Sequence, residues 1–193
     1  MREIVFHGRA GQGVVTSAEL LGKTAVVEGK YAQSFAFFGA ERRGAPVVSF
    51  VRIDDQPIRT KEQIYEPSHV VILDSAIFQS VDVKQGFDPF TVFSMGIKPN
   101  GKMLINTTDN LEKIANLLKT NLKLYVVDST SIAMDYIKKS VVSIVMLGAL
   151  SKAFGFITLG SLKEVIFQKF PNKLGEMNWK GAKAAFESVE GEE

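Results

Sequence analysis

Three short apolar runs, each ending in a polar residue, restrict the fold of this sequence more than any other feature. They are HVVILD at residues 69–74, KMLIN at residues 102–106 and KLYVVD at residues 123–128. Compact apolar runs of this kind are typical of strands covered by helices on both faces of a sheet. A helical segment follows each run, at about residues 76–83, 110–120 and 131–139. This alternation predicts an α/β fold, a three-layer α/β/α sandwich.

The remaining segments refine that prediction. EIVFHG is a short strand, and residues 14–29 place apolar side chains at helical spacing before Gly29 ends the helix. PVVSFVRID at residues 46–54 alternates and runs into the turn signal DDQP, which favours a hairpin over a crossover. We therefore expect a mixed, mostly parallel, Rossmann-like sheet with a largely helical C-terminal part. A chain of 193 residues is most simply one domain, residues 1–193.

Charge, hydropathy and cysteine content exclude several classes of protein. The net charge of +2 is too weak to indicate a nucleic-acid or membrane partner. No apolar stretch of about 20 residues and no signal peptide is present, so we expect a cytoplasmic protein. The chain has no cysteine, so it cannot supply thiolates to an iron–sulfur cluster, and its 2 histidines predict no metal site.

A glycine turn between the first strand and the first helix is the leading candidate for a binding site. Gly8, Gly11 and Gly13 read G-x-x-G-x-G, which matches neither the dinucleotide fingerprint nor a P-loop. Glycine permits positive φ and close approach of a ligand, and a helix start directs backbone N–H groups at an anion. The alternative is that these glycines serve only a tight turn. The GKT triplet at residues 22–24 lies within the predicted helix and cannot cradle phosphates.

A second candidate is the pair Arg42 and Arg43 in the stretch FFGAERRGAPV. Arginine binds phosphate or carboxylate groups through two parallel hydrogen bonds, and glycine-flanked loops commonly carry function. The alternative is a solvated loop in which one arginine pairs with Glu41.

Other polar residues have simpler interpretations. Asp74, Asn106 and Asp128 close predicted strands and are expected mostly to cap helices. His7 and His69 are expected to be structural. No nucleophile and no pair of acidic residues suits acid–base catalysis, so we assign no catalytic residue to this chain.

Five stretches together resemble the gamma subunit of pyruvate, or more broadly 2-oxoacid, ferredoxin oxidoreductases. They are GRAGQGVVTSAELL, EGKYAQSFAFFGAERRGAPVVSFVRI, PSHVVILD, IKPNGKMLIN and NWKGAKAAFE, so the resemblance extends over essentially the whole chain. Indolepyruvate enzymes share the glycine loop but are less similar around ERRGAP. One departure is Ala10, where the family usually has glycine.

The resemblance implies a subunit of an enzyme that oxidatively decarboxylates a 2-oxoacid such as pyruvate. That reaction forms an acyl-CoA, acetyl-CoA from pyruvate, and reduces ferredoxin. The implied partners are alpha, beta and ferredoxin-like delta subunits, and other chains would hold thiamine diphosphate, Mg and the iron–sulfur clusters. The isolated chain would then be inactive, and this chain itself would hold no cofactor.

Coenzyme A is the anionic substrate that the resemblance leaves for this chain. Its phosphates suit a helix N-terminus together with arginines. The hypothesis is that coenzyme A contacts seven residues: Gly8, Arg9, Gly11, Gln12, Gly13, Arg42 and Arg43.

Three alternatives stay open. The chain could serve an oxidoreductase for 2-oxoisovalerate or 2-oxoglutarate, or both motifs could form a subunit interface with no ligand. An independent nucleotide-binding domain fits least, because both standard fingerprints fail. The aromatic stretches SFAFF at residues 34–38 and FGFITLG at residues 154–160 are expected either at an interface or in the core.

Overall fold

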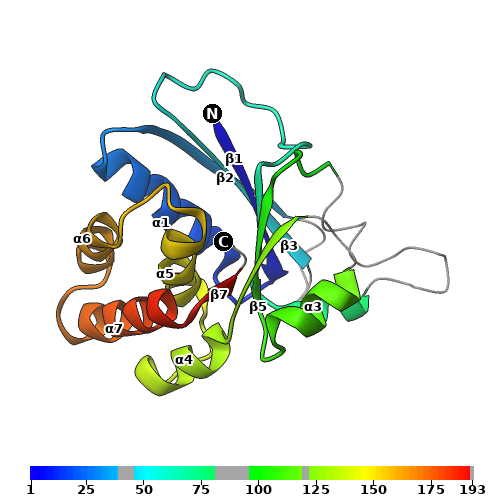
Figure 1. Cartoon of the computed structure of the whole chain (residues 1–193). Helices are drawn as coiled ribbons and strands as arrows, with labels where there is room; N and C mark the ends of the chain where they lie inside the picture. Colours follow the sequence, from blue (N-terminus) through cyan, green and yellow to red (C-terminus); the bar gives the residue numbers. More distant parts are fainter. Residues whose placement is uncertain (39–45, 81–95, 119–121, 192–193) are drawn as a thin grey trace.

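One mixed sheet of seven strands organises the protein (Figure 1). The structure is a computed structural model that describes residues 1–38, 46–80, 96–118 and 122–191. The strand order is β2-β3-β1-β4-β5-β6-β7. The bounds are Arg2–Arg9 for β1, Tyr31–Phe38 for β2, Pro46–Asp54 for β3, His69–Ile72 for β4, Lys102–Asn106 for β5, Lys123–Val127 for β6 and Glu190–Gly191 for β7.

Strand directions confirm a mixed sheet with a parallel centre. Strands β1, β4, β5 and β6 pair in parallel in that order. Strand β3 is antiparallel to both β1 and β2, and β7 is antiparallel to β6. The predicted α/β class is confirmed.

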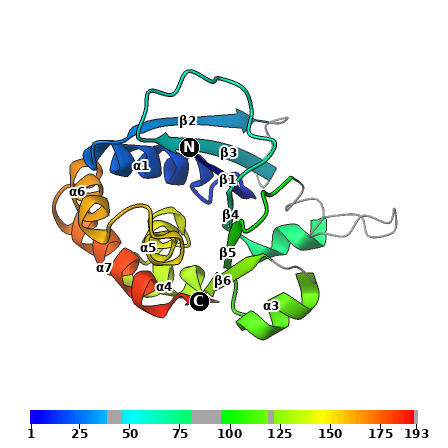
Figure 2. The same ribbon diagram turned by 45° about the horizontal axis from the view of Figure 1, so that its top comes forward.

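Helices cover both faces of this sheet, which gives the predicted three layers (Figures 1 and 2). One face carries five helices: α1 (Val14–Val27), α4 (Ser129–Tyr136), α5 (Ser143–Phe154), α6 (Leu159–Lys169) and α7 (Asn172–Ser188). The other face carries α3 (Leu111–Leu118) and the short 3-10 helix η1 (Ser75–Ser80).

Alternation along each strand divides the buried side chains between these two layers. In β1, Ile4 and Phe6 join the core beneath α1 and α5, whereas Val5 joins the core beneath α3. In β5, Leu104 faces the first core and Met103 faces the second. Burial on both faces explains why these strands are continuously apolar in the sequence.

The position of the hairpin differs from the prediction. The prediction placed it after β3, at DDQP, but β3 pairs with the preceding β2 and with β1, and the chain then leads to β4 on the far side of β1. A turn signal shows that the chain changes direction and does not show which strand lies alongside.

Several finer predictions also differ at the edges of elements. The segment predicted as a helix at residues 76–83 forms the 3-10 helix η1 up to Ser80, and the remainder lies outside the described residues. The aromatic stretch at residues 154–160 belongs to the core, because Phe154 and Phe156 are buried. Within the described ranges, no helix has both the length and the apolarity needed to cross a membrane.

Candidate functional site

The glycine loop joins β1 to α1 and needs glycine at two of its positions. Gly11 and Gly13 have φ angles of 98° and 86°, a region that side chains disfavour. A Cβ at Gly13 would also lie 2.7 Å from the Cβ of Ser143, which is closer than side chains pack. Because Gly13 directly precedes α1, this conformation sets the position of the helix start.

Side chains of the loop brace it against the end of β4. Gln12 accepts a hydrogen bond from Arg9 N through Oε1 (2.7 Å) and donates one from Nε2 to Asp74 Oδ2 (2.8 Å). Arg9 donates from Nη2 to Ala76 O (3.2 Å), and its Nε lies 3.4 Å from Asp74 Oδ2. Arg9 and Gln12 therefore fix the shape of the loop in the described structure.

Two helices begin beside this loop. The start of α5 contacts the start of α1, because Ser17 Oγ donates to Ser143 O at 3.3 Å and Ser143 packs against Gly13. Neither helix has a side-chain hydrogen bond at its N-cap, and neither has an acidic residue in its first turn. The first N–H groups of a helix lack partners within the helix and carry a partial positive charge. The meeting of two such ends makes this region favourable for an anion.

A pocket of about 430 Å³ opens at the same place. It lies at the carboxyl ends of parallel strands, the usual position of ligand sites in open α/β sheets. Its lining residues are Ala10, Gly11, Gln12, Leu73, Asp74, Asn106, Thr130, Ser140 and Val142.

Asn106 is the most deeply buried polar residue of this lining, with 6% of its surface exposed. Its Nδ2 donates to Leu73 O (2.8 Å) and Thr130 Oγ1 (2.9 Å), which ties β5 to the end of β4 and to α4. Its Oδ1 has no hydrogen-bond partner among the described residues. Asn106 therefore positions the pocket wall and does not cap a helix, contrary to the expectation for it.

The arginine pair lies outside the described residues, but both flanks of its segment are described. Pro46 pairs with Arg9, the last residue of β1, and Phe38 pairs with Val47. The ends of β2 and β3 that flank residues 39–45 thus lie at the same end of the sheet as the glycine loop.

The other predicted polar roles are resolved by their contacts. Asp128 caps α4, as expected, because its side chain accepts a hydrogen bond from Ser131 N at 2.9 Å. His69 packs between the rings of Phe154 and Phe156, at centroid distances of 4.5 and 5.2 Å. Burial, together with the nearby positive charges of Lys102 and Arg2, lowers the pKa of His69 to about 4.

His7 is half-buried, as His69 is, and its removal from water lowers its pKa to about 4. Both histidines are therefore neutral near pH 7. Within the described parts of the chain, no three acidic or histidine side chains group so that they could hold a metal ion.

The sequence indicated the glycine loop but not the second half of the pocket. Ser140 and Val142 of the lining, and Ser143 beside Gly13, come about 130 residues after the loop and carry no motif of their own. Only the packing of α5 against α1 brings them together. The one signal in the sequence was that no capping side chain precedes the apolar helix α5. That signal alone does not indicate a site.

Comparison with known proteins places this chain in a well-defined group. The family model described as pyruvate ferredoxin/flavodoxin oxidoreductase matches residues 3–188. The chain is 45% identical over 190 residues to the pyruvate/ketoisovalerate oxidoreductases common subunit gamma of Thermococcus litoralis, covering 98% of this chain and 97% of that protein. It is 43% identical over 189 residues to pyruvate synthase subunit PorC of Methanothermobacter marburgensis, covering 98% of each.

A crystal structure shows the same fold. Pyruvate oxidoreductase subunit PORC of Thermotoga maritima superimposes with a TM-score of 0.85 at 31% identity, covering 100% of this chain and 98% of that one.

Proposed function

Because this chain belongs to the pyruvate ferredoxin/flavodoxin oxidoreductase family as a gamma subunit, we propose that its own part in catalysis is to bind coenzyme A. The enzyme oxidatively decarboxylates a 2-oxoacid, forms the acyl-CoA and passes electrons to ferredoxin. The observation that carries the proposal is the convergence of the glycine loop, two uncapped helix starts and the pocket at one end of the sheet.

The remaining chemistry belongs to partner chains in this proposal. The chain lacks cysteine, so it cannot ligate an iron–sulfur cluster. Thiamine diphosphate, Mg and the clusters are therefore assigned to alpha, beta and ferredoxin-like delta subunits of one complex. The choice of 2-oxoacid is assigned to the same partners. A relative named as the gamma subunit common to pyruvate and ketoisovalerate oxidoreductases is consistent with that assignment.

Phosphate groups of coenzyme A are the part of the ligand that this site suits. Backbone N–H groups at the start of α1 and of α5 favour an anion, and Gly11 lines the pocket without a side chain to obstruct it. Gly8 and Gly13 contribute by allowing Val14 and Ser143 to pack against the loop. Arg9 and Gln12 contribute by holding the loop, and the charge of Arg9 offsets that of Asp74. Part of the ligand would occupy the 430 Å³ pocket, since a cavity of this size suits a small-molecule fragment.

Arg42 and Arg43 are within reach of this site by chain length. Arg43 precedes Pro46 by three residues, so their Cα atoms cannot be more than about 11 Å apart. Pro46 lies opposite Arg9 at the end of β1. We therefore assign both arginines to the phosphates of coenzyme A, where a planar guanidinium binds phosphate through two parallel hydrogen bonds.

A double substitution tests this assignment in the assembled enzyme. Each charge-assisted hydrogen bond contributes roughly 1.5–3 kcal/mol, and about 1.4 kcal/mol corresponds to a factor of ten. Arg42→Ala with Arg43→Ala should raise the KM for coenzyme A at least about tenfold. Decarboxylation of the 2-oxoacid without coenzyme A should be nearly unchanged, and Arg→Lys should recover only part of the loss.

Arg59→Ala is the matched control, because Arg59 is exposed on the loop between β3 and β4. It should leave the KM for coenzyme A unchanged. If the double variant instead dissociates from its partner chains while the remaining complex binds coenzyme A normally, the segment is a subunit interface. That outcome would reject the coenzyme A assignment.

A further inference from the structure

The two edges of the sheet are built very differently. Strand β7 at one edge has two residues, is exposed and ends in a run of glutamates. Short, charged strands of this kind discourage pairing with other chains. Strand β2 at the other edge has eight residues, Tyr31–Phe38, and carries no charged side chain and no proline. Within the described residues, β2 is therefore neither short nor charged nor interrupted by proline, and these are three of the features that protect an edge.

Side chains along β2 are also incompletely covered. Tyr31 is 49% exposed and Phe37 is 55% exposed, although both are aromatic. Ser34, midway between them, is exposed as well. A long, apolar edge with exposed aromatic residues is a ready template for another strand.

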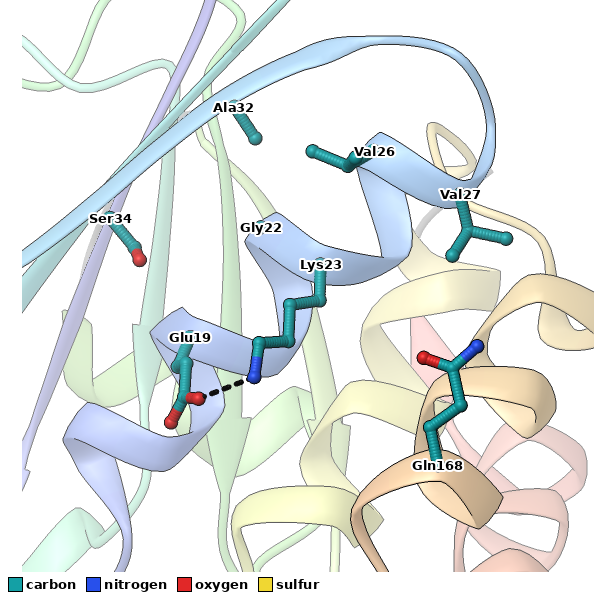
Figure 3. A pocket seen from close by; sticks show the side chains of 8 residues that line it. All are labelled: Glu19, Gly22, Lys23, Val26, Val27, Ala32, Ser34 and Gln168. Atoms are coloured by element: carbon teal, nitrogen blue, oxygen red, sulfur yellow. Dashed lines mark hydrogen bonds and ion pairs between the residues drawn. The ribbon is translucent and has the colours of Figure 1, made fainter.

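A groove runs beside this edge, between α1 and β2 (Figure 3). It has a volume of about 430 Å³ and is lined by Glu19, Gly22, Lys23, Val26, Val27, Ala32, Ser34 and Gln168. Val26 in its wall is 56% exposed. Helix α1 lies close to β2 here, because a Cβ at Gly22 would be only 3.7 Å from Ala32 Cβ and Ser34 Oγ.

We propose that β2 pairs antiparallel with β2 of a second copy of this chain, with Ser34 facing Ser34 on a two-fold axis. An axis perpendicular to the sheet relates like faces, so the sheet continues through both copies. In this register Ala32 faces Ala36 and Tyr31 faces Phe37. Small residues then lie near the axis, and the exposed aromatic residues pair across the strands, which is a stabilising combination.

The same two-fold axis would bring charged side chains of α1 in one copy opposite charges of the other sign in the second copy. Glu19 and Lys23 lie one turn apart on α1 and pair with each other at 2.7 Å, and Glu19 also pairs with Lys169 of α6 at 2.9 Å. Gly22 lies in the same turn of α1 and packs against Ser34, so this turn lies beside the proposed axis. The two-fold operation reverses the direction of α1, so Lys23 of one copy faces Glu19 of the other. A two-fold interface requires this kind of self-complementarity.

A single cysteine tests both the partner and the register, because the natural chain has none. Directly opposed residues in antiparallel strands have Cα atoms about 4.5–5.5 Å apart, which suits a disulfide. Ser34→Cys in the assembled complex should therefore give a covalent dimer of this chain under mild oxidation. The readout is non-reducing electrophoresis with mass spectrometry of the linked peptides.

Ala36→Cys is the matched control on the same strand. The proposed register offsets residue 36 from its own copy by four residues, about 14 Å, which is beyond disulfide reach. Ser188→Cys, exposed beside the opposite edge, controls for random collision. Equal linkage at residues 34 and 36, no linkage at residue 34, or linkage of residue 34 to a different subunit would each overturn the proposal.

A second variant tests the pairing without a covalent bond. Ser34→Lys places two like charges opposite each other on the axis and should halve the mass of the assembled complex in light scattering, whereas Ser34→Thr should not. Unchanged mass for Ser34→Lys would overturn the proposal, and circular dichroism shows that the variant is folded.

Discussion

At the scale of single residues, Gly11 and Gly13 are glycine for two different physical reasons, which the sequence motif cannot distinguish. Both have positive φ, at 98° and 86°. Among the described residues other than its two chain neighbours, no atom lies within 4 Å of a Cβ at Gly11, whereas a Cβ at Gly13 would overlap Ser143. Gly11 is thus required only by the backbone conformation. Gly13 is required both by the backbone conformation and by the contact between α1 and α5.

These differences predict unequal costs of alanine at the two positions. Gly11→Ala should lower the free energy of unfolding by about 1–2 kcal/mol, the cost of a left-handed conformation. Gly13→Ala should cost more, by about 1–3 kcal/mol, because the added methyl group overpacks Ser143. Urea denaturation measures both.

Adding Ser143→Gly to Gly13→Ala removes the overlapping atoms and should recover part of the loss. Equal costs at Gly11 and Gly13 would show that the contact between α1 and α5 does not constrain the loop.

The two half-buried histidines predict how stability depends on pH. The unfolded chain binds these protons near pH 6.5, whereas His7 and His69 bind them only near pH 4 in the folded chain. Between these values the unfolded state holds more protons, so stability falls as the pH falls. From pH 7 to pH 5, each histidine should lower the free energy of unfolding by about 2 kcal/mol.

His69→Gln, which cannot titrate, should lose about half of that dependence when unfolding by urea is compared at the two pH values. An unchanged slope would mean that the pKa of His69 is the same in the folded and the unfolded chain.

From the sequence, the individual residues of the glycine loop could be named as candidates for binding, because glycine spacing between a strand and a helix is a local signal. It did not predict the bracing by Gln12 and Asp74, which are 62 residues apart. Nor did it indicate Asn106 as a wall of the pocket. Such roles depend on which strand ends meet, and only the completed sheet determines that.

At the scale of elements, α5 and α7 approach each other so closely that their backbones are in contact. A Cβ at Gly148 would collide with the backbone carbonyl of Ala182. Asn178 and Ala185 of α7 are buried at the same interface layer. Helices with a glycine at their crossing can pack backbone against backbone, and any side chain there forces them apart.

Gly148→Ala should therefore destabilise the protein strongly, by about 3 kcal/mol or more, because backbone atoms cannot move aside as a side chain does. Gly160→Ala is the matched control within α6, since among the described residues its Cβ would meet only Thr158 Oγ1, at 3.9 Å. That change should be neutral or stabilising by up to about 1 kcal/mol, as alanine favours helices. Thermal unfolding distinguishes the two, and similar melting temperatures would contradict the packing argument.

Elements of the parallel centre were predictable because each strand is buried on both faces and reads as an apolar run. The edges were not. Strand β7 has two residues and no apolar pattern, and it forms only because α7 returns the chain to β6. The hairpin partner of β3 was likewise predicted wrongly: it was expected after β3 in the chain, whereas β3 pairs with β2 and β1. Which strands pair depends on the whole sheet and not on the local sequence.

At the scale of the whole molecule, this fold resembles a ligand-binding platform more than a reaction centre. The glycine loop, the pocket and the flanks of residues 39–45 all lie at one end of the sheet. The edge strand β2 offers a separate surface for a second copy. In the two proposals above, binding of coenzyme A and pairing with a second copy would thus use different parts of the same sheet.

The last prediction follows from this division of labour between the chain and its partners. The purified chain, supplied with thiamine diphosphate, coenzyme A and pyruvate, should not reduce ferredoxin or a dye, because it has no thiolate for a cluster. Adding the alpha, beta and delta chains should restore reduction that depends on pyruvate and coenzyme A. A complex lacking only this chain is the control and should bind coenzyme A at least about tenfold more weakly. Turnover by the chain alone would contradict its role as a subunit, and normal binding of coenzyme A without it would contradict its role as a binding platform.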